Sequence, residues 1–281
     1  MRRIIYLCTF AALFTINHLF MKVRKSDFFP EEYCVSGITD DDYRKVKRKL
    51  SGELDMLSRV TNCGYYVVDY FKNNFLYVSE NIAYWCGQPS DKVREMGFEL
   101  FNGFVPDGDL AKLIEIHNEW IRQLMTMPID DWSDTSLIFD FRFQGEKSYR
   151  MVNQKVTPYT IRNGKIWLEL CILSLSSEEQ NQFVVMKKRK ADWFYEYSLK
   201  KHTWCRRILK TLTASENEVF LLSVRGFACK QIADMLGRSE ETIKIQRKAI
   251  LKRLGVSSFA SVAVHAVNYD LLPMYKDTLN N

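Results

Sequence analysis

The chain of 281 residues is 47% hydrophobic and 14% aromatic, which supplies a full core, excludes a mainly disordered protein and leaves room for two domains. Its net charge of +6 is uneven, because residues 178–281 hold 18 Lys and Arg against 11 Asp and Glu, whereas the preceding residues are almost neutral. A positive excess in the last third is typical either of a solvated basic face or of a surface that binds nucleic acid.

The seven cysteines are scattered, with no Cys-x-x-Cys pair and no histidine at zinc-ligand spacing. This pattern favours a reducing compartment in which each cysteine is a small buried side chain. It predicts neither a disulfide framework nor a metal site.

Residues 1–21 form an apolar N-terminal segment, in which Met1-Arg2-Arg3 is followed by a largely apolar run from Ile4 to Met21 that ends before Lys22-Val23-Arg24-Lys25. A cleaved signal peptide is disfavoured, because no small-x-small cleavage site follows the segment. Two interpretations stay open. The segment is a short anchor in the inner membrane with the C-terminus in the cytoplasm, or translation begins at Met21 and the protein is cytoplasmic.

Residues 40–60 carry apolar side chains every three or four positions among many charges, which predicts an amphipathic lead helix. Its first residues, Asp40-Asp41-Asp42, are typical of a solvated helix start. From Gly64 the pattern changes to two short strands, several short helices and a longer helix, and then three more strands. This order predicts an α+β domain with a five-stranded antiparallel sheet. The expected strands are Tyr65–Asp69, Phe75–Val78, Ser136–Phe143, Tyr149–Val156 and Lys165–Leu175, and the longer helix is Asp109–Met125.

Residues 54–176 resemble a PAS domain. The resemblance is carried by Tyr77-Val78-Ser79-Glu80-Asn81 running into a helix, by Gly87 and Gly97, and by the run from Phe104 to Leu110. It implies a module for sensing or dimerisation, with a cavity between sheet and helices that leaves room for a small-molecule ligand. His117 lies where some haem-binding PAS proteins keep an axial ligand, but a single helical histidine is more typical of a surface or core position. We therefore predict no cofactor.

Residues 177–205 are expected to form a basic connector that includes Lys187-Lys188-Arg189-Lys190. Aromatic and polar residues then alternate from Trp193 to Leu199, which predicts a strand, with a hairpin closed near Lys200-Lys201. The basic run is more typical of a solvated face than of a contact to DNA phosphates.

Residues 206–272 contain four predicted helices. Thr213 and Glu216 have the spacing of a capping box, and Gly226 closes the helix that follows. Cys229–Leu236 is a second helix, and Ser239 caps a third whose inward side chains include Ile243 and Ile250. A fourth begins near Ser257 or Ser258. Two helices joined by a tight turn with a glycine, the second of them basic, are typical of a helix-turn-helix.

This segment resembles the LuxR-type DNA-binding domain over Leu212 to Val256. Matching residues include Leu212-Thr213, Glu216, Glu218-Val219, Gly226, Ile232-Ala233, Leu236, Thr242-Ile243-Lys244 and Lys252-Arg253-Leu254-Gly255-Val256. The resemblance implies that Lys244, Ile245 and Lys248 read base edges. Two departures are Gln246 in place of a frequent His, and Ala228 where Ser or Thr commonly caps the second helix. The full predicted DNA-binding set is Ser239, Thr242, Lys244, Ile245, Arg247, Lys248, Lys230, Lys252 and Arg253.

The sequence therefore predicts a transcription regulator that binds double-stranded DNA as a homodimer, with the PAS-like part sensing a signal or assisting dimerisation. An alternative is a sigma-factor-like or accessory helix-turn-helix protein that acts with RNA polymerase. An enzyme is disfavoured, because the sequence has no Gly-rich phosphate loop, no His-Glu-x-x-His and no nucleophile with an evident base.

Overall fold

The computed structural model describes residues 24–144, 148–176, 183–210, 212–254 and 258–262. The chain divides into two compact units, one up to Ser176 with Phe183 and Val184, and one from Val185 onward. The apolar segment of residues 1–21 lies outside the described residues. Within the described ranges, no helix has both the length and the apolar character needed to span a membrane.

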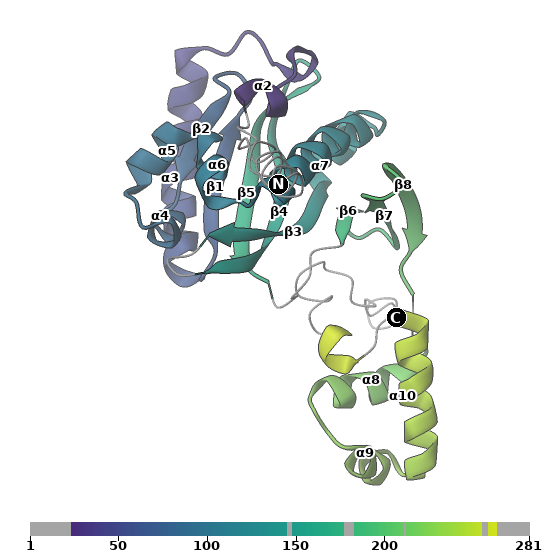
Figure 1. The fold of residues 1–281 in the computed structure, drawn as a ribbon. Helices are drawn as coiled ribbons and strands as arrows, with labels where there is room; N and C mark the ends of the chain where they lie inside the picture. The colour runs from purple at the N-terminus through teal and green to yellow at the C-terminus, as the bar shows by residue number, and fades with distance from the viewer. Residues whose placement is uncertain (1–23, 145–147, 177–182, 211, 255–257, 263–281) are drawn as a thin grey trace, which may run out of the picture. The chain divides into compact units, whose positions relative to one another are not determined.

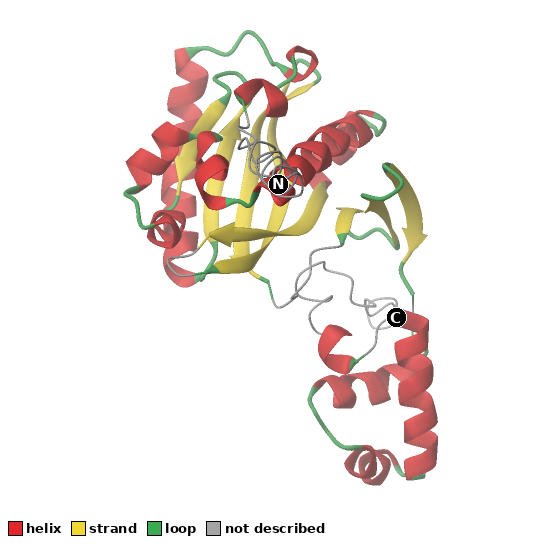
Figure 2. Ribbon diagram, viewed as in Figure 1, coloured by secondary structure: helices red, strands yellow, loops and turns green. Residues whose placement is uncertain are grey.

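The first unit is an α+β domain (Figures 1 and 2). Along the chain, a block of helices separates its first two strands from the next three. The lead helix α3 spans Asp40–Val60, the same residues whose spacing predicts an amphipathic helix. The other elements are α2 (Lys25–Phe28), η1 (Glu31–Tyr33), β1 (Gly64–Asp69), β2 (Asn74–Val78), α4 (Glu80–Cys86), α5 (Ser90–Met96), α6 (Glu99–Phe104), α7 (Asp107–Met125), η2 (Ile129–Asp134), β3 (Thr135–Gln144), β4 (Tyr149–Arg162) and β5 (Lys165–Leu175).

The sheet has eight strands in the order β2-β1-β5-β4-β3-β6-β7-β8, so the predicted count of five was wrong. The expected five strands are present, and the supposed connector adds β6 (Val184–Lys188), β7 (Trp193–Ser198) and β8 (Thr203–Ile208). Strand β6 escaped prediction because its apolar half, Val184 to Met186, is only three residues long and runs into the basic cluster. The hairpin expected near Lys200-Lys201 is confirmed by the antiparallel pairing of β7 with β8.

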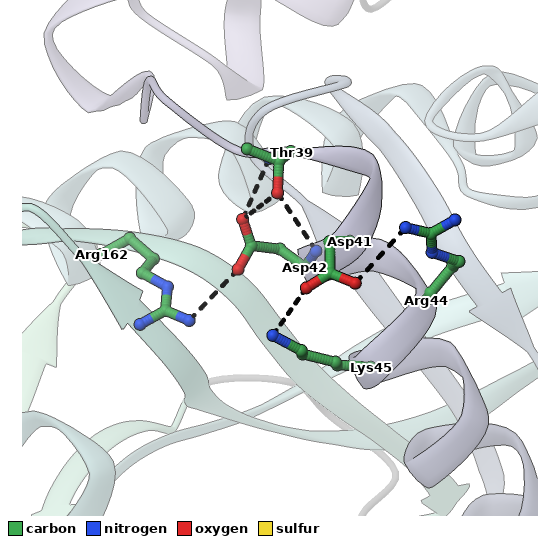
Figure 3. Close-up of polar contacts among 6 residues, drawn as sticks. All are labelled: Thr39, Asp41, Asp42, Arg44, Lys45 and Arg162. Atoms are coloured by element: carbon green, nitrogen blue, oxygen red, sulfur yellow. Dashed lines mark hydrogen bonds and ion pairs between the residues drawn. The ribbon is translucent and has the colours of Figure 1, made fainter.

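The start of α3 is held by polar contacts that Figure 3 shows in detail. The Thr39 hydroxyl accepts a hydrogen bond from the backbone N–H of Asp42, and the Asp42 carboxylate accepts one from the backbone N–H of Thr39 at 3.0 Å. Asp42 also pairs with Arg162 at the end of β4, at 3.5 Å. Asp41 pairs with Lys45 one turn later at 2.6 Å. The acidic run is therefore a helix start, as its sequence predicts, and Thr39 adds a cap that was not predicted.

One face of the sheet is covered by α6 and α7 (Figure 1). All six residues of β1 are buried, and most residues of β3 and β5 are buried or half-buried. Because successive side chains of a strand point to opposite faces, these central strands are covered on both faces of the sheet. The β4–β5 turn is tight, with Asn163 at φ 51° and Gly164 at φ 72°. Two consecutive positive φ values are the requirement of a type I′ hairpin, which Asn-Gly satisfies.

Residues 25–35 form a strap that closes over this helical side of the domain. Phe28, Phe29 and Tyr33 on it are no more than 5% exposed. The Asn118 side-chain amide on α7 donates to the Asp27 carbonyl at 3.0 Å, and Lys165 Nζ donates to the Cys34 carbonyl at 3.0 Å. The strap is therefore part of the core rather than a loose N-terminal extension.

A buried carboxylate, Glu169 on β5, lies at the centre of the domain and is 1% exposed. It accepts hydrogen bonds from the Tyr70 hydroxyl at 2.9 Å and from Trp120 Nε1 at 2.8 Å. Burial raises its pKa from an ordinary value of 4.5 to about 7, and the two hydrogen bonds only partly oppose this. Nearby, His117 Nε2 donates to the Phe28 carbonyl at 3.1 Å, and burial lowers the pKa of His117 to about 4.

Replacing Glu169 should change how stability depends on pH. Because the folded state raises the pKa of Glu169, it binds the proton more tightly than the unfolded chain does, and stability falls as pH rises from about 4.5 to about 7. Glu169→Gln keeps the shape and one acceptor oxygen, which can still accept from Trp120 Nε1, and its uncharged amide removes this loss, which amounts to roughly 3 kcal/mol at full ionisation. Thermal unfolding between pH 5 and about 8 should therefore show a smaller decrease in Tm for the variant. An equal decrease in both proteins would contradict the assignment.

Candidate nucleic-acid interface

The helical part of the second unit comprises α8 (Ala214–Val224), α9 (Cys229–Leu236) and α10 (Glu240–Leu254), followed by helical residues 259–262. The rest of the predicted fourth helix lies outside the described residues. The three helices and residues 259–262 share a core of its own, in which Val219, Ile232, Ile243 and Ile250 are fully buried. Phe259 and Val262 close that core from the C-terminal side.

Helix α8 begins at the predicted capping box, which the geometry confirms. The Thr213 hydroxyl accepts from the backbone N–H of Glu216 at 3.2 Å, and the Glu216 carboxylate accepts from the backbone N–H of Thr213 at 2.9 Å. A second oxygen of Glu216 pairs with Arg253 at 3.0 Å. The same carboxylate therefore fixes the start of α8 and the end of α10.

The start of α9 lacks a hydroxyl cap because Ala228 stands at the N-cap position, as the sequence comparison with the LuxR type anticipated. Gln231 compensates in part, since its side-chain oxygen accepts from the backbone N–H of Ala228 at 2.9 Å. The helix ends at Gly237, whose φ of 62° lies in the left-handed region that glycine adopts without a steric penalty. This turn leads directly into α10.

Helix α10 begins at Ser239, whose hydroxyl accepts from the backbone N–H of Thr242 at 3.1 Å. Burial of Ile243 and Ile250 turns the opposite side of the helix outward. That outward side carries Lys244, Ile245 and Lys248, and Ile245 is 61% exposed. An exposed isoleucine between two lysines, one turn from the helix start, can offer both charge and apolar contact to a groove.

Apart from the half-buried Arg247, the other predicted residues are all exposed, and two of the exposed residues form ion pairs. Ser239, Thr242, Lys230 and Lys252 are exposed. Lys244 and Arg253 are exposed but ion-paired, Lys244 with Glu240 at 3.0 Å and Arg253 with Glu216. The pairing with Glu240 raises the pKa of Lys244.

Arg247 differs from the rest of the predicted set because it is half-buried. Its guanidinium donates to the carbonyl of Phe227 at 3.1 Å and lies over the ring of Phe259, 4.8 Å from the ring centroid. It therefore joins the turn before α9 to the helical segment after α10. The structure places this side chain against protein rather than on the exposed stripe.

Sequence reasoning overlooked two residues of this region. Ala249 is exposed, four positions after Ile245, and that helical spacing could have indicated it. Arg238 donates to the Glu218 carboxylate at 2.7 Å and lies 3.5 Å from the side-chain oxygen of Gln246. Gln246 in turn donates to the Ser215 hydroxyl at 3.2 Å, so the residue that departs from the LuxR pattern ties α10 to α8. No local sequence signal marks that contact.

Residues 210–266 match the family model described as bacterial regulatory proteins, luxR family. Solved structures similar to the chain include a phage VqmA–DPO complex, at 14% identity and TM-score 0.29 over 84% of this chain and 96% of that one. Another is the Vibrio cholerae VqmA dimer without its target DNA, at 14% identity and TM-score 0.32 over 81% and 91%. These scores are too low to establish a common fold. No curated protein matches the sequence.

The family match spans α8, α9 and α10 together with the capped starts and glycine-ended turns that set their geometry. These residues of the chain therefore form a DNA-binding domain of the LuxR type, a helix-turn-helix of the bacterial regulatory proteins.

Proposed function

We propose that the protein is a sequence-specific transcription regulator in which α10 enters the major groove of double-stranded DNA. The observation that carries this proposal is the outward stripe of α10, where Lys244, Ile245 and Lys248 are all exposed on a helix whose other side buries Ile243 and Ile250. A helix fixed in this way presents the same side chains to every DNA site, which direct readout requires.

Within this interface we assign different roles to different residues. Lys244, Ile245 and Lys248 contact base edges, with Ala249 beside them as a small apolar contact. Ser239, Thr242, Lys230 and Lys252 contact the phosphate backbone, together with Arg253 once its pairing with Glu216 is shared with DNA. Arg247 acts as a positioning residue, since its contacts go to Phe227 and Phe259.

The first unit, through its PAS-like residues 54–176, is proposed to sense a signal and to assist homodimer formation. Support for an interface comes from the last turn of α3, where Met56, Leu57 and Val60 lie on one side of the helix and are 52%, 37% and 74% exposed. Apolar residues grouped on one side of an exposed helix end are typical of a surface that another chain covers. Two DNA-binding domains joined in this way would recognise two half-sites.

A first test separates base reading from charge on α10. Lys248→Ala should weaken the binding free energy by about 1–3 kcal/mol on the cognate site and by less on scrambled DNA. Lys252→Ala is the matched control, because it removes the same side chain one turn later on the same helix. Because Lys252 is proposed to contact a phosphate, Lys252→Ala should weaken binding to both DNAs about equally. It should also lower the slope of log affinity against log salt concentration by about one. Equal losses for both variants on both DNAs, measured over a salt series, would overturn the reading role of Lys248.

A second test concerns Arg247. Arg247→Ala removes the bond to Phe227 and the contact with the Phe259 ring, so it should destabilise the helical core by about 1–3 kcal/mol. Lys244→Ala is the control for stability, since it loses only an exposed pair with Glu240 and should leave the free energy of unfolding nearly unchanged. Both are measured by denaturant unfolding. Unchanged stability in Arg247→Ala together with an altered base preference would instead make Arg247 a reader.

A third test addresses the dimer. Val60→Asp places a charge in the exposed apolar group of α3, and it should shift the mass measured by sedimentation toward the monomer. Affinity for a two-half-site operator should fall at least about tenfold, because the second domain is no longer tethered. Ile208→Asp on β8, 69% exposed, is the matched control and should leave the mass unchanged. A Val60→Asp protein that remains a dimer would exclude this face.

A further inference from the structure

The strands β6, β7 and β8 form an antiparallel meander that carries a large positive charge (Figure 1). Residues 188–210 hold eight Lys and Arg against two Asp and Glu, which is a net charge of +6. The helix-turn-helix residues 212–254 hold eight Lys and Arg against five Asp and Glu, which is only +3. The meander therefore has a larger positive excess than the domain recognised as DNA-binding.

Folding places this charge at both ends of β7, although the basic residues before β7 form a single run in the sequence. Lys187 is 5% exposed and Lys188 is half-buried, whereas Lys190 is exposed at the turn between β6 and β7. Lys200 and Lys201 are exposed at the turn between β7 and β8, at the opposite end of β7. Within the described ranges, no carboxylate pairs with these three exposed lysines.

Arg206 lies between the two turns, on β8, which stands at one edge of the sheet. Its guanidinium carbon is 4.8 Å from the centroid of the Trp193 ring on β7, and the side chain stays exposed. Stacking uses the face of the guanidinium and leaves the N–H donors at its edge available to an anion. The neighbouring Arg207 is instead paired with Glu196 at 2.8 Å.

The exposed cations of the meander are spread along a line. The six residues of β7 separate the two turns, and at about 3.3 Å per residue this distance is roughly 20 Å. A single phosphate ion is too small to contact both turns. Double-stranded DNA carries one negative charge per about 1.7 Å of its axis, so its backbone matches charges spread over this length.

The linker after β8 limits how far the meander can lie from the helix-turn-helix. Strand β8 ends at Ile208 and α8 begins at Ala214, and six residues of fully extended chain reach at most about 20 Å. The start of α8 is in turn joined to the end of α10 by the pair between Glu216 and Arg253 at 3.0 Å. A duplex bound to α10 therefore passes within reach of the meander.

We propose that the meander is a second DNA contact, at which four exposed cations bind the phosphate backbone outside the groove that α10 enters: Lys190, Lys200, Lys201 and Arg206. Phosphates are the same at every base pair, so this contact adds affinity without sequence selectivity. The proposal rests on the DNA binding proposed for α10 and extends it to residues that precede the luxR family match at 210–266.

The test measures binding of the full chain to a scrambled duplex over a salt series, because phosphate contacts do not depend on sequence. The double variant Lys200→Ala/Lys201→Ala should bind at least roughly tenfold more weakly at about 0.1 M salt, and its slope of log affinity against log salt concentration should be lower by about two. Lys200→Arg/Lys201→Arg keeps both charges and should retain the wild-type affinity. Lys47→Ala/Lys49→Ala is the matched control, since it removes two exposed lysines of α3 and should change neither affinity nor slope.

Equal affinity and equal slope for Lys200→Ala/Lys201→Ala and the wild type would overturn the proposal, and these lysines would then only keep the edge strand from pairing with another sheet. An equal loss in the α3 control would reduce the effect to net charge and would also overturn it. The preference for cognate over scrambled DNA should be unchanged in the meander variant, and a lost preference would contradict a phosphate contact. A wild type that binds neither duplex would instead show that the function proposed for α10 fails.

Discussion

Burial of Ile243 and Ile250 fixes the rotation of α10 about its axis, and the side of the helix that we propose binds DNA depends on that constraint. Both side chains are 0% exposed, and they lie seven residues apart, close to two helical turns. A rotation of α10 by one residue would expose an isoleucine and bury a lysine, so the core excludes it. Gly237 ends α9, the Ser239 hydroxyl caps the start of α10, and the core sets which way α10 faces.

The helix-turn-helix was predictable because its signals are local. A capping box spans four residues, a glycine ends a helix by its own conformation, and apolar spacing marks the inward face. The contacts of Arg247 were not predictable in this way, since a basic residue on a basic helix is expected to contact DNA. Only the approach of Phe227 and Phe259, which lie 20 positions before and 12 positions after it in the sequence, shows where that guanidinium goes.

In the first unit too, features marked by local sequence patterns were predictable, and contacts between distant residues were not. Its five predicted strands are present because alternation and turn residues mark them, whereas β6 was missed because its apolar part is too short to alternate. The burial of Glu169 is not evident from the sequence, where the residue stands between Leu168 and Leu170 like any outward polar residue of a strand. Its burial follows from the pairing of β5 with β1, which sets Glu169 opposite Val68 on a covered face.

The strap of residues 25–35 has a consequence for how the chain folds during synthesis. Its hydrogen-bond partners on α7 lie 89 and 91 residues later, and the partner of Cys34 lies 131 residues later. The strap leaves the ribosome before any of them, so Phe28 lacks its contacts with Phe98 and His117 until α7 has been made, and the bond from Lys165 to Cys34 forms later still. Closure over the helices is therefore a late step of high contact order. Until it occurs, two aromatic side chains remain open to chaperones and to aggregation.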